Sequence, residues 1–134
     1  MRAQTVTISQ RMTRTPHLIG SDQTMNAAHE MMRNHGIRHL PVLHGGKLVG
    51  LLSVRDLHLV ETLPDVNPEL VRVEEAMSQD VFAVPPTTPL AEVVREMAER
   101  RLGSAVVVEG IKVVGVFTTV DALETLAELL DGGS

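Results

Sequence analysis

Hydrophobic positions along the chain follow two periods, and the same order of segments occurs twice. Residues 40–43 and 47–52 are nearly continuous apolar runs separated by His44-Gly45-Gly46, a turn that permits positive φ. Residues 105–108 and 112–117 repeat this pattern. Because strands of this kind are typical of a sheet that is covered on both faces, each copy needs helices. Each copy is therefore predicted to be an extended segment, a helix, two strands and a second helix, which is an α/β (α+β) fold.

Apolar residues at helical spacing precede each strand pair. In the first copy they are Met25, Ala28 and Met32, and Gly36 supplies an expected carboxyl-terminal stop. In the second copy they are Leu90, Val93, Val94 and Met97. Thr88 is a suitable N-cap for this helix. Pro89 would then be the first helical residue, a position that tolerates the missing N–H of proline. The closing helices are predicted to begin after Ser53 and after Thr118.

The two copies are related by a shift of 65 residues. Under that shift the following residues match: Met12 with Met77, Met32 with Met97, Val42 with Val107, Gly45 with Gly110, Gly50 with Gly115 and Asp56 with Asp121. Two copies favour a closed pair with a pseudo-twofold axis over an open solenoid. We expect one module with repeats at residues 10–62 and 75–130. Residues 63–74, which contain Pro64 and Pro68, are the expected linker.

Composition narrows the class of protein. At 134 residues with 43% hydrophobic content, the chain has the size of one globular domain. No apolar run approaches the roughly 20 residues needed to span a bilayer, and residues 1–5 lack the apolar core of a signal peptide. The absence of cysteine fits a reducing compartment, so a cytoplasmic protein without membrane association is expected.

Charge argues against nucleic-acid binding. Residues 1–65 contain seven Lys/Arg against five Asp/Glu, and residues 66–134 contain five against twelve. Neither half has an extended basic face, and Phe82 and Phe117 are the only aromatic residues available to stack on bases. We therefore expect no nucleic-acid partner.

The other candidate chemistry is weak. All six histidines lie in the first copy, but no carboxylate pattern completes a metal-ligand set around His35 and His39. No strained nucleophile turn accompanies a Ser/His/Asp set, and no glycine-rich loop carries a phosphate-binding lysine. We expect no catalytic residue, no metal and no required cofactor, and therefore no enzyme.

A hydroxyl and a carboxylate three residues apart follow each strand pair, as Ser53 with Asp56 and as Thr118 with Asp121. One interpretation is a helix cap, in which the hydroxyl accepts from an orphan N–H and the acid meets the positive helix end. The other is ligand binding, because a carboxylate at this place can accept both hydroxyls of a ribose.

Two motifs, each present in both copies, resemble a tandem pair of CBS domains, often called a Bateman module. They are residues 37–42 (IRHLPV) with 49–56 (VGLLSVRD), and residues 102–107 (LGSAVV) with 114–121 (VGVFTTVD). The resemblance implies binding sites that join the two repeats, with the aspartate on the ribose and strand-edge backbone on the adenine. One implied site joins Phe82, Leu102, Gly103 and Ser104 to Ser53, Arg55 and Asp56. The other joins His17, Ile37, Arg38 and His39 to Thr118, Val120 and Asp121.

The two implied sites differ in their complement to a phosphate. Arg55 offers a guanidinium fork, whereas the matching Val120 offers no charge. Gly103 leaves room where the matching Arg38 crowds the position or adds a charge. The site that contains Arg55 is therefore the better predicted nucleotide site.

The resemblance predicts a regulatory module that binds an adenine nucleotide (AMP, ADP or ATP) and acts on a partner protein in trans. Two alternatives remain: a protein-interaction scaffold without a small ligand, and a sensor of S-adenosylmethionine or NAD. The last helix has Val120, Leu123, Leu126, Ala127 and Leu130 on one stripe. Because a small domain cannot easily cover this stripe, we expect a homodimer held largely by the closing helices.

Overall fold

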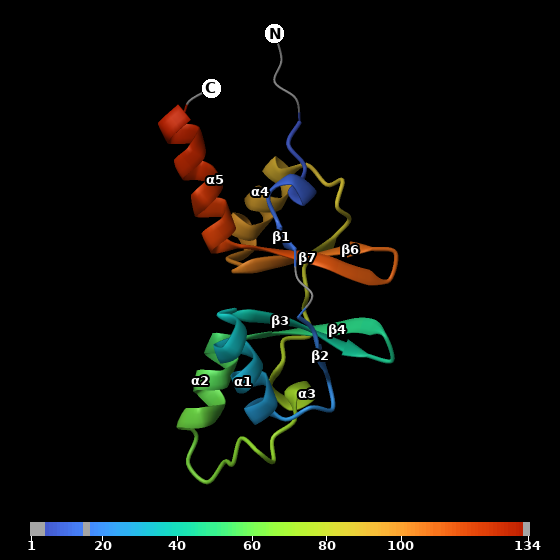
Figure 1. The fold of residues 1–134 in the computed structure, drawn as a ribbon, viewed down its shortest axis with the longest axis vertical. Coiled ribbons are helices and arrows are strands. Elements are labelled where there is room, and N and C mark those ends of the chain that lie inside the picture. Colours follow the sequence, from blue (N-terminus) through green and yellow to red (C-terminus); the bar gives the residue numbers. More distant parts are fainter. Residues whose placement is uncertain (1–4, 15–16, 133–134) are drawn as a thin grey trace. The chain divides into compact units, whose positions relative to one another are not determined.

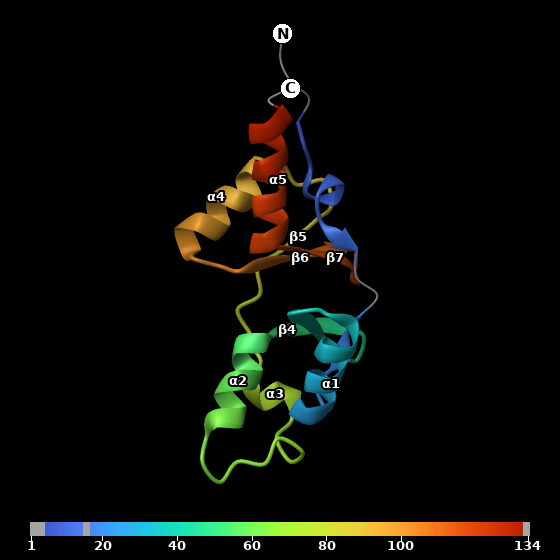
Figure 2. The same cartoon turned by 60° about the vertical axis from the view of Figure 1, so that its left-hand side comes forward.

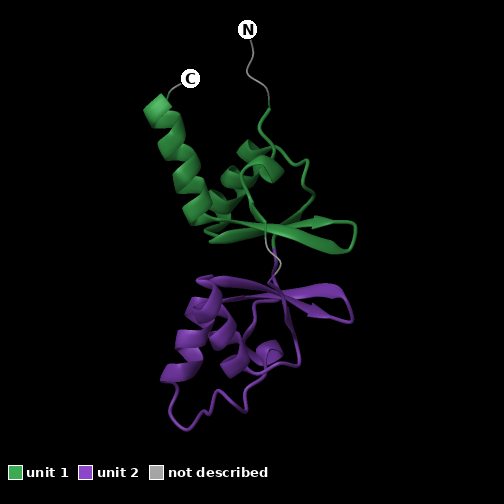
Figure 3. Cartoon of the chain, in the orientation of Figure 1, with its two compact units in different colours: residues 1–16, 82–134 green, residues 17–81 purple. Residues whose placement is uncertain are grey.

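The computed structural model describes residues 5–14 and 17–132, which divide into two compact units (Figures 1 and 3). Unit 2 consists of residues 17–81, and unit 1 combines residues 82–132 with residues 5–14. Residues 1–4, on which the signal-peptide prediction partly rests, lie outside the described residues.

Unit 2 has a three-stranded sheet in the order β2-β3-β4. Strand β2 is parallel to β3, and β3 is antiparallel to β4. In Figure 2 the helices of this unit lie on one side of its sheet. The elements of unit 2 are β2 (Ile19–Gly20), α1 (Met25–His35), β3 (His39–His44), β4 (Lys47–Ser53), α2 (Val54–Thr62) and α3 (Val73–Ala76).

Unit 1 has a four-stranded sheet in the order β1-β7-β6-β5. Strands β1 and β6 are both antiparallel to β7, and β5 is parallel to β6. Its elements are the 3-10 helix η1 (Ile8–Gln10), β1 (Thr13–Arg14), β5 (Ala83–Val84), α4 (Leu90–Arg100), β6 (Ser104–Glu109), β7 (Lys112–Thr118) and α5 (Thr119–Gly132). The mixed helix–sheet architecture confirms the predicted fold class.

The strand pairs keep the 65-residue register that the sequence predicts. His39 is opposite Ser53 in unit 2, and Ser104 is opposite Thr118 in unit 1. The register shifts between residues 42 and 43 in β3 and between residues 107 and 108 in β6, which are matching positions. The repeat therefore extends to the backbone irregularities of the two units.

Gly50 and Gly115 match because a neighbouring segment crosses each of them closely. A Cβ at Gly115 would lie 2.9 Å from the Thr13 carbonyl oxygen and 2.5 Å from Met12 Sδ. A Cβ at Gly50 would lie 3.0 Å from the Ser78 carbonyl oxygen and would collide with Met77 Sδ. Only glycine leaves room for this approach of the backbone.

The crossing segments show that the leading segment of each repeat packs on the other repeat. Residues 5–14 belong to unit 1, where Thr13 pairs with Val116 of β7. Residues 73–81 belong to unit 2, where Ser78 pairs with Leu51 of β4. Val73 is fully buried there, so part of the segment predicted as a linker belongs to the core of unit 2.

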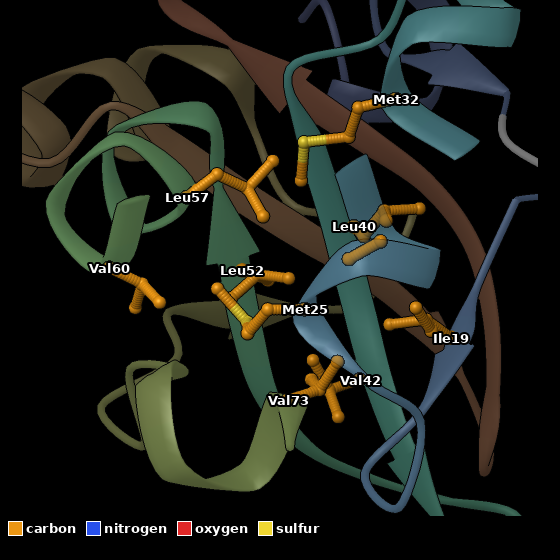
Figure 4. Packing of buried hydrophobic residues seen from close by; sticks show 10 residues of the cluster. Ile19, Met25, Met32, Leu40, Val42, Leu52, Leu57, Val60 and Val73 are labelled. Carbon is orange, nitrogen blue, oxygen red and sulfur yellow. The ribbon is translucent and has the colours of Figure 1, made fainter. Parts of the chain in front are cut away.

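Each unit has its own hydrophobic core. In unit 2, residues from both helices of the repeat and from its strands meet Val73 of α3, as Figure 4 shows. The buried members of this core are Ile19, Met25, Ala28, Met32, Leu40, Val42, Leu52, Leu57, Val60 and Val73. In unit 1 they are Ile8, Leu90, Val93, Met97, Ala105, Val107 and Phe117. Ile8 and Val73 both come from the exchanged leading segments, so the exchange contributes directly to both cores.

The start and the outer face of α4 differ from the prediction. Pro89, not Thr88, is the N-cap, and the Thr88 hydroxyl instead donates to the Pro85 carbonyl at 2.8 Å. The Leu90 N–H donates to the Val6 carbonyl at 2.8 Å, so the leading segment satisfies the helix start. Val94, predicted in the buried stripe, is 37% exposed. By contrast, α1 ends at Gly36 in the left-handed conformation, as predicted.

The closing helix α5 buries little of its apolar surface within the chain. None of its residues is buried, and its large apolar side chains are 49–76% exposed: Val120, Leu123, Leu126, Leu129 and Leu130. The leftover apolar stripe predicted from the sequence is therefore present. Within residues 5–14 and 17–132, no helix has the length and apolar character needed to cross a membrane.

Candidate functional site

The carboxylate of Asp56 is held at the start of α2 by the hydroxyl residue that precedes the helix. Asp56 Oδ2 accepts from the Ser53 N–H at 2.8 Å and from Ser53 Oγ at 3.0 Å. The Asp56 N–H donates back to Ser53 Oγ at 3.3 Å, which completes a capping box. Asp56 Oδ1 accepts no hydrogen bond from the described residues. The capping interpretation is thus correct for Ser53 and Asp56, and one carboxylate oxygen remains for another partner.

The matching carboxylate in unit 1 has the same cap and one further contact. Asp121 Oδ2 accepts from the Thr118 N–H at 2.9 Å and from Thr118 Oγ1 at 3.2 Å. Asp121 Oδ1 accepts from Thr13 Oγ1 at 2.9 Å. Because Thr13 belongs to the exchanged leading segment, this oxygen is engaged in unit 1 while its equivalent in unit 2 is not. The sequence prediction missed Thr13, although the matching residue in the second copy, Ser78, also has a hydroxyl.

The predicted base-reading residues lie beside these carboxylates within each unit. In unit 2 the Val54 N–H donates to the Arg38 carbonyl at 3.0 Å, and His39 is opposite Ser53 in the sheet. Ile37, which precedes Arg38, is half-buried and packs against the core. The strand pairing thus brings the two sequence motifs of a repeat together at one end of its sheet.

Unit 1 repeats this arrangement with smaller side chains. The Thr119 N–H donates to the Gly103 carbonyl at 3.1 Å, and the buried Ser104 is opposite Thr118. Leu102 packs against the core of the unit. The exposed Gly103 stands where unit 2 has the side chain of Arg38, so this end of the sheet is less crowded in unit 1.

Phe82 and His17 are the first residues of the long chain segments that form unit 1 and unit 2, respectively. The Phe82 carbonyl accepts from the Val106 N–H at 2.8 Å, and its ring lies 5.6 Å from Arg100 Cζ, within range of a cation–π contact. The His17 ring is stacked on His35, with centroids 3.9 Å apart. These two residues are therefore ordered by contacts within their own units.

Arg55 and Val120 differ in chemistry, as the sequence indicates. Both lie in the first turn of their helices and both are exposed. Arg55 has no ion pair with any described residue, which leaves its guanidinium available to an anion.

Each predicted ligand site takes one set of residues from each repeat, and the structure orders each set inside its own unit. Ser53, Arg55 and Asp56 with Ile37, Arg38 and His39 lie at the sheet end of unit 2. Thr118, Val120 and Asp121 with Leu102, Gly103 and Ser104 lie at the sheet end of unit 1. The joining of the two sets in one site stays a prediction.

Two of the cavities that unit 2 contains are relevant here, one away from its sheet end and one beside it. One, of about 540 Å³, is at the β2 and hairpin end, where the buried Ser21 Oγ lies 3.1 Å from His44 Nδ1. The Ser21 backbone is also paired at both its N–H and its carbonyl, so this contact anchors the hairpin to β2. The other cavity, of about 330 Å³, is a groove between α1 and α2 that contains the hydrogen bond between His29 Nδ1 and Glu61 Oε2 at 2.9 Å. No group of three or more potential metal ligands occurs among the described residues.

Comparison with known proteins places this geometry in a family. The model of the CBS domain matches residues 7–60 and 73–128, which cover both repeats with their leading segments. A curated relative, the inosine-5'-monophosphate dehydrogenase of Korarchaeum cryptofilum, is 32% identical over 104 residues. That match covers 77% of this chain but 21% of the dehydrogenase, so the chain spans about a fifth of that relative's length.

Solved structures share the whole fold. A putative acetoin utilization protein (AcuB) from Vibrio cholerae has a TM-score of 0.81 and 29% identity, covering 96% of this chain and 95% of its own. The CBS domain pair of protein MJ0100, solved in complex with 5'-methylthioadenosine and S-adenosyl-L-methionine, has a TM-score of 0.83 and 22% identity, covering 92% and 98%. With two matched segments, a 65-residue register and this shared fold, the chain belongs to the CBS domain family as a tandem pair.

Proposed function

We propose that this CBS pair is a regulatory module that binds an adenosine-containing ligand between its two repeats. The observation that carries the proposal is the carboxylate of Asp56. Its Oδ2 is fixed by Ser53, and its Oδ1 accepts no hydrogen bond from the described residues. A fixed carboxylate with one available oxygen suits a pair of vicinal hydroxyls, because it loses little freedom on binding. The MJ0100 pair, solved with two adenosine compounds, supports this class of ligand at the level of the fold.

Among adenosine ligands we propose a nucleotide with a phosphate (AMP, ADP or ATP). The support is Arg55, which is exposed, lies one residue before Asp56 and has no ion pair with the described residues. A guanidinium fork matches phosphate oxygens, whereas S-adenosylmethionine has a cationic sulfonium and no phosphate. The predicted site that contains Asp56 is the better nucleotide site, because Asp121 already accepts from Thr13 and Val120 adds no charge.

A protein-interaction role is the second candidate, and α5 is the observation that favours it. Its residues Leu123, Leu126, Leu129 and Leu130 are all exposed on one helix. A group of neighbouring exposed apolar side chains is typical of a protein interaction surface. We propose that a homodimer covers this surface, and that ligand binding changes the stability of one arrangement of helices over another. A separate partner protein acted on in trans is part of the same proposal.

Titration calorimetry with AMP, ATP, adenosine, NAD and S-adenosylmethionine tests the ligand. We expect AMP or ATP to bind more tightly than adenosine, and a ligand present at 100 times its Kd to stabilise the fold by about 2.7 kcal/mol in thermal unfolding. GMP is the control for base recognition, and the Asp56→Ala/Asp121→Ala double variant is the control for the site. Absence of binding by all five compounds to folded protein would leave the scaffold as the function.

A further inference from the structure

Helix α5 lacks the apolar anchors that hold its counterpart α2. In α2, Leu57 and Val60 are only 4% and 7% exposed and belong to the core of unit 2. The 65-residue shift places Ala122 and Thr125 at these positions, and no residue of α5 is buried. Ala122 is half-buried against the core of unit 1. Because both anchors have lost apolar area, hydrophobic burial holds α5 on its unit more weakly than it holds α2.

Polar contacts with the leading segment also connect α5 to unit 1. Arg11 Nη1 donates to Glu128 Oε2 at 2.6 Å, and Thr13 Oγ1 donates to Asp121 Oδ1 at 2.9 Å. Asp121 and Glu128 are seven residues apart, or about two turns, so both acceptors lie on the same face of the helix. The Glu128 side chain is 63% exposed. An exposed ion pair and a single hydroxyl hydrogen bond contribute modestly in water, so this attachment can be released.

The carboxylate of Asp121 is the group that a ribose would use in the second proposed site. Its Oδ2 already accepts from the N–H and the hydroxyl of Thr118, so both lone pairs of that oxygen are engaged. Oδ1 also has two lone pairs, and Thr13 engages one of them. The contacts of the described residues thus leave one acceptor position on Asp121, whereas the two hydroxyls of a ribose need two. Full ribose binding and the Thr13 contact therefore exclude each other.

Unit 2 has the same carboxylate without this competitor. Asp56 Oδ2 accepts both hydrogen bonds of the cap, while Oδ1 accepts none from the described residues and keeps two acceptor positions. Ser78 matches Thr13 and pairs with Leu51 as Thr13 pairs with Val116. The Ser78 hydroxyl makes no hydrogen bond with a described residue. The backbone is thus the same in both units, and the contact of the side chain with the carboxylate is specific to unit 1.

We propose that Arg11, Thr13, Asp121 and Glu128 form a polar latch on α5, and that a ribose bound at Asp121 opens the latch by displacing Thr13. The inference rests on the proposed function and assigns a regulatory role to the second site. Asp121 keeps its cap with Thr118, so α5 stays helical when the latch opens. Because full ribose binding requires the open latch, the ligand shifts the population toward a released α5. Occupancy of this site is thereby coupled to the helix that carries the exposed leucines.

Spin labels on unit 1 test whether the latch holds α5. The chain has no cysteine, so Glu99→Cys on α4 and Asp131→Cys on α5 provide two exposed and unique labelling positions. Labelled chain diluted into a large excess of unlabelled chain restricts double electron–electron resonance to distances within one copy. We expect a narrow distance distribution for the otherwise wild-type chain. Thr13→Val and Arg11→Gln should each at least double its width, and AMP that fills the second site should do the same without a substitution.

Matched controls change the leading segment outside the latch. The Thr7 hydroxyl contacts Ser9 and not α5, and Arg14 has no ion pair with a described residue. Thr7→Val and Arg14→Gln should therefore leave the distribution narrow.

Calorimetry in an Asp56→Ala background isolates the second site. Adding Thr13→Val to this background should lower the Kd for AMP about threefold to tenfold, because the ligand no longer displaces a hydrogen bond. A higher Kd would show that Thr13 helps to bind the ligand, and would overturn its role as a competitor.

The remaining outcomes separate the latch from the proposed function. If Thr13→Val and Arg11→Gln leave the distribution narrow, the polar contacts do not hold α5 and the inference is wrong. If AMP fills the second site while α5 keeps a narrow distribution, the ligand does not open the latch, although the proposed function stands. Binding to the wild type but not to Asp56→Ala would also overturn the opening by ligand. Absence of binding to the wild type would overturn the proposed function itself.

Discussion

Asp56 has two roles that a pair of substitutions can separate. In the structure its Oδ2 accepts two hydrogen bonds from Ser53, whereas its Oδ1 accepts none from the described residues. Asp56→Asn keeps the shape of the side chain and one acceptor oxygen for the Ser53 N–H, but removes the charge. Asp56→Ala removes both. The cap responds mainly to the loss of the acceptor, and a ribose contact responds mainly to the loss of the charge.

The expected effects on stability follow from these contacts. Loss of the cap in Asp56→Ala should lower the free energy of unfolding by about 0.5–2 kcal/mol, the usual range for capping residues. Asp56→Asn loses only the interaction of the charge with the helix amino terminus, about 0.3–1 kcal/mol, because its amide oxygen can still accept. Urea denaturation measures both values, and Asn should lie clearly between wild type and Ala.

The expected effects on affinity are larger and are the same for the two substitutions. Hydrogen bonds from ribose hydroxyls to a carboxylate contribute about 1.5–3 kcal/mol, so either substitution should raise the Kd for AMP about tenfold to a hundredfold. Calorimetry well below the unfolding transition measures this loss on folded protein. Glu92→Gln is a matched control, because Glu92 is an exposed acid in the first turn of α4 and lies outside both motifs. It should change stability slightly and leave affinity unchanged.

One result would refute the reasoning. If Asp56→Asn and Asp56→Ala lower the stability in the expected order but bind AMP as tightly as wild type, the carboxylate is a helix cap and nothing more. The duplicated hydroxyl–carboxylate motif would then be explained by folding alone.

Three further predictions rest on other contacts. Arg55→Ala should weaken AMP binding at least tenfold while leaving adenosine nearly unchanged, and Val120→Ala should affect neither; equal losses for AMP and adenosine in calorimetry would remove the phosphate role of Arg55. Gly50→Ala and Gly115→Ala should each lower the free energy of unfolding by about 1–3 kcal/mol in urea, because the new Cβ meets backbone oxygens at 3.0 and 2.9 Å; wild-type stability would show that the crossing segments yield. Leu123→Glu should shift the mass in light scattering from dimer to monomer without loss of secondary structure by circular dichroism, since the leucine is 59% exposed in the single chain; an unchanged dimer would place the interface elsewhere.

The sequence determined what depends on local patterns. Strand pairs, the glycine turn, the helix stop at Gly36 and the caps at Ser53 and Thr118 depend on residues close together in the chain, and the structure confirms them. The 65-residue repeat predicts that the two strand pairs share one register, and β3–β4 and β6–β7 do so. The sequence alone does not distinguish capping from ribose binding, since both need the same residue types at the same spacing.

The tertiary structure decided what depends on residues far apart. The start of α4 at Pro89, and not at Thr88, follows from the Val6 carbonyl, more than 80 residues away in the chain. The exchange of leading segments explains why Met12, Thr13, Met77 and Ser78 matter, although their local sequence predicts only extended backbone. The difference between Asp56 and Asp121 has the same origin, because Thr13 reaches only one of the two carboxylates. Local periodicity predicts which face of an element is apolar, but the neighbour that covers that face is chosen by the packing of the whole chain.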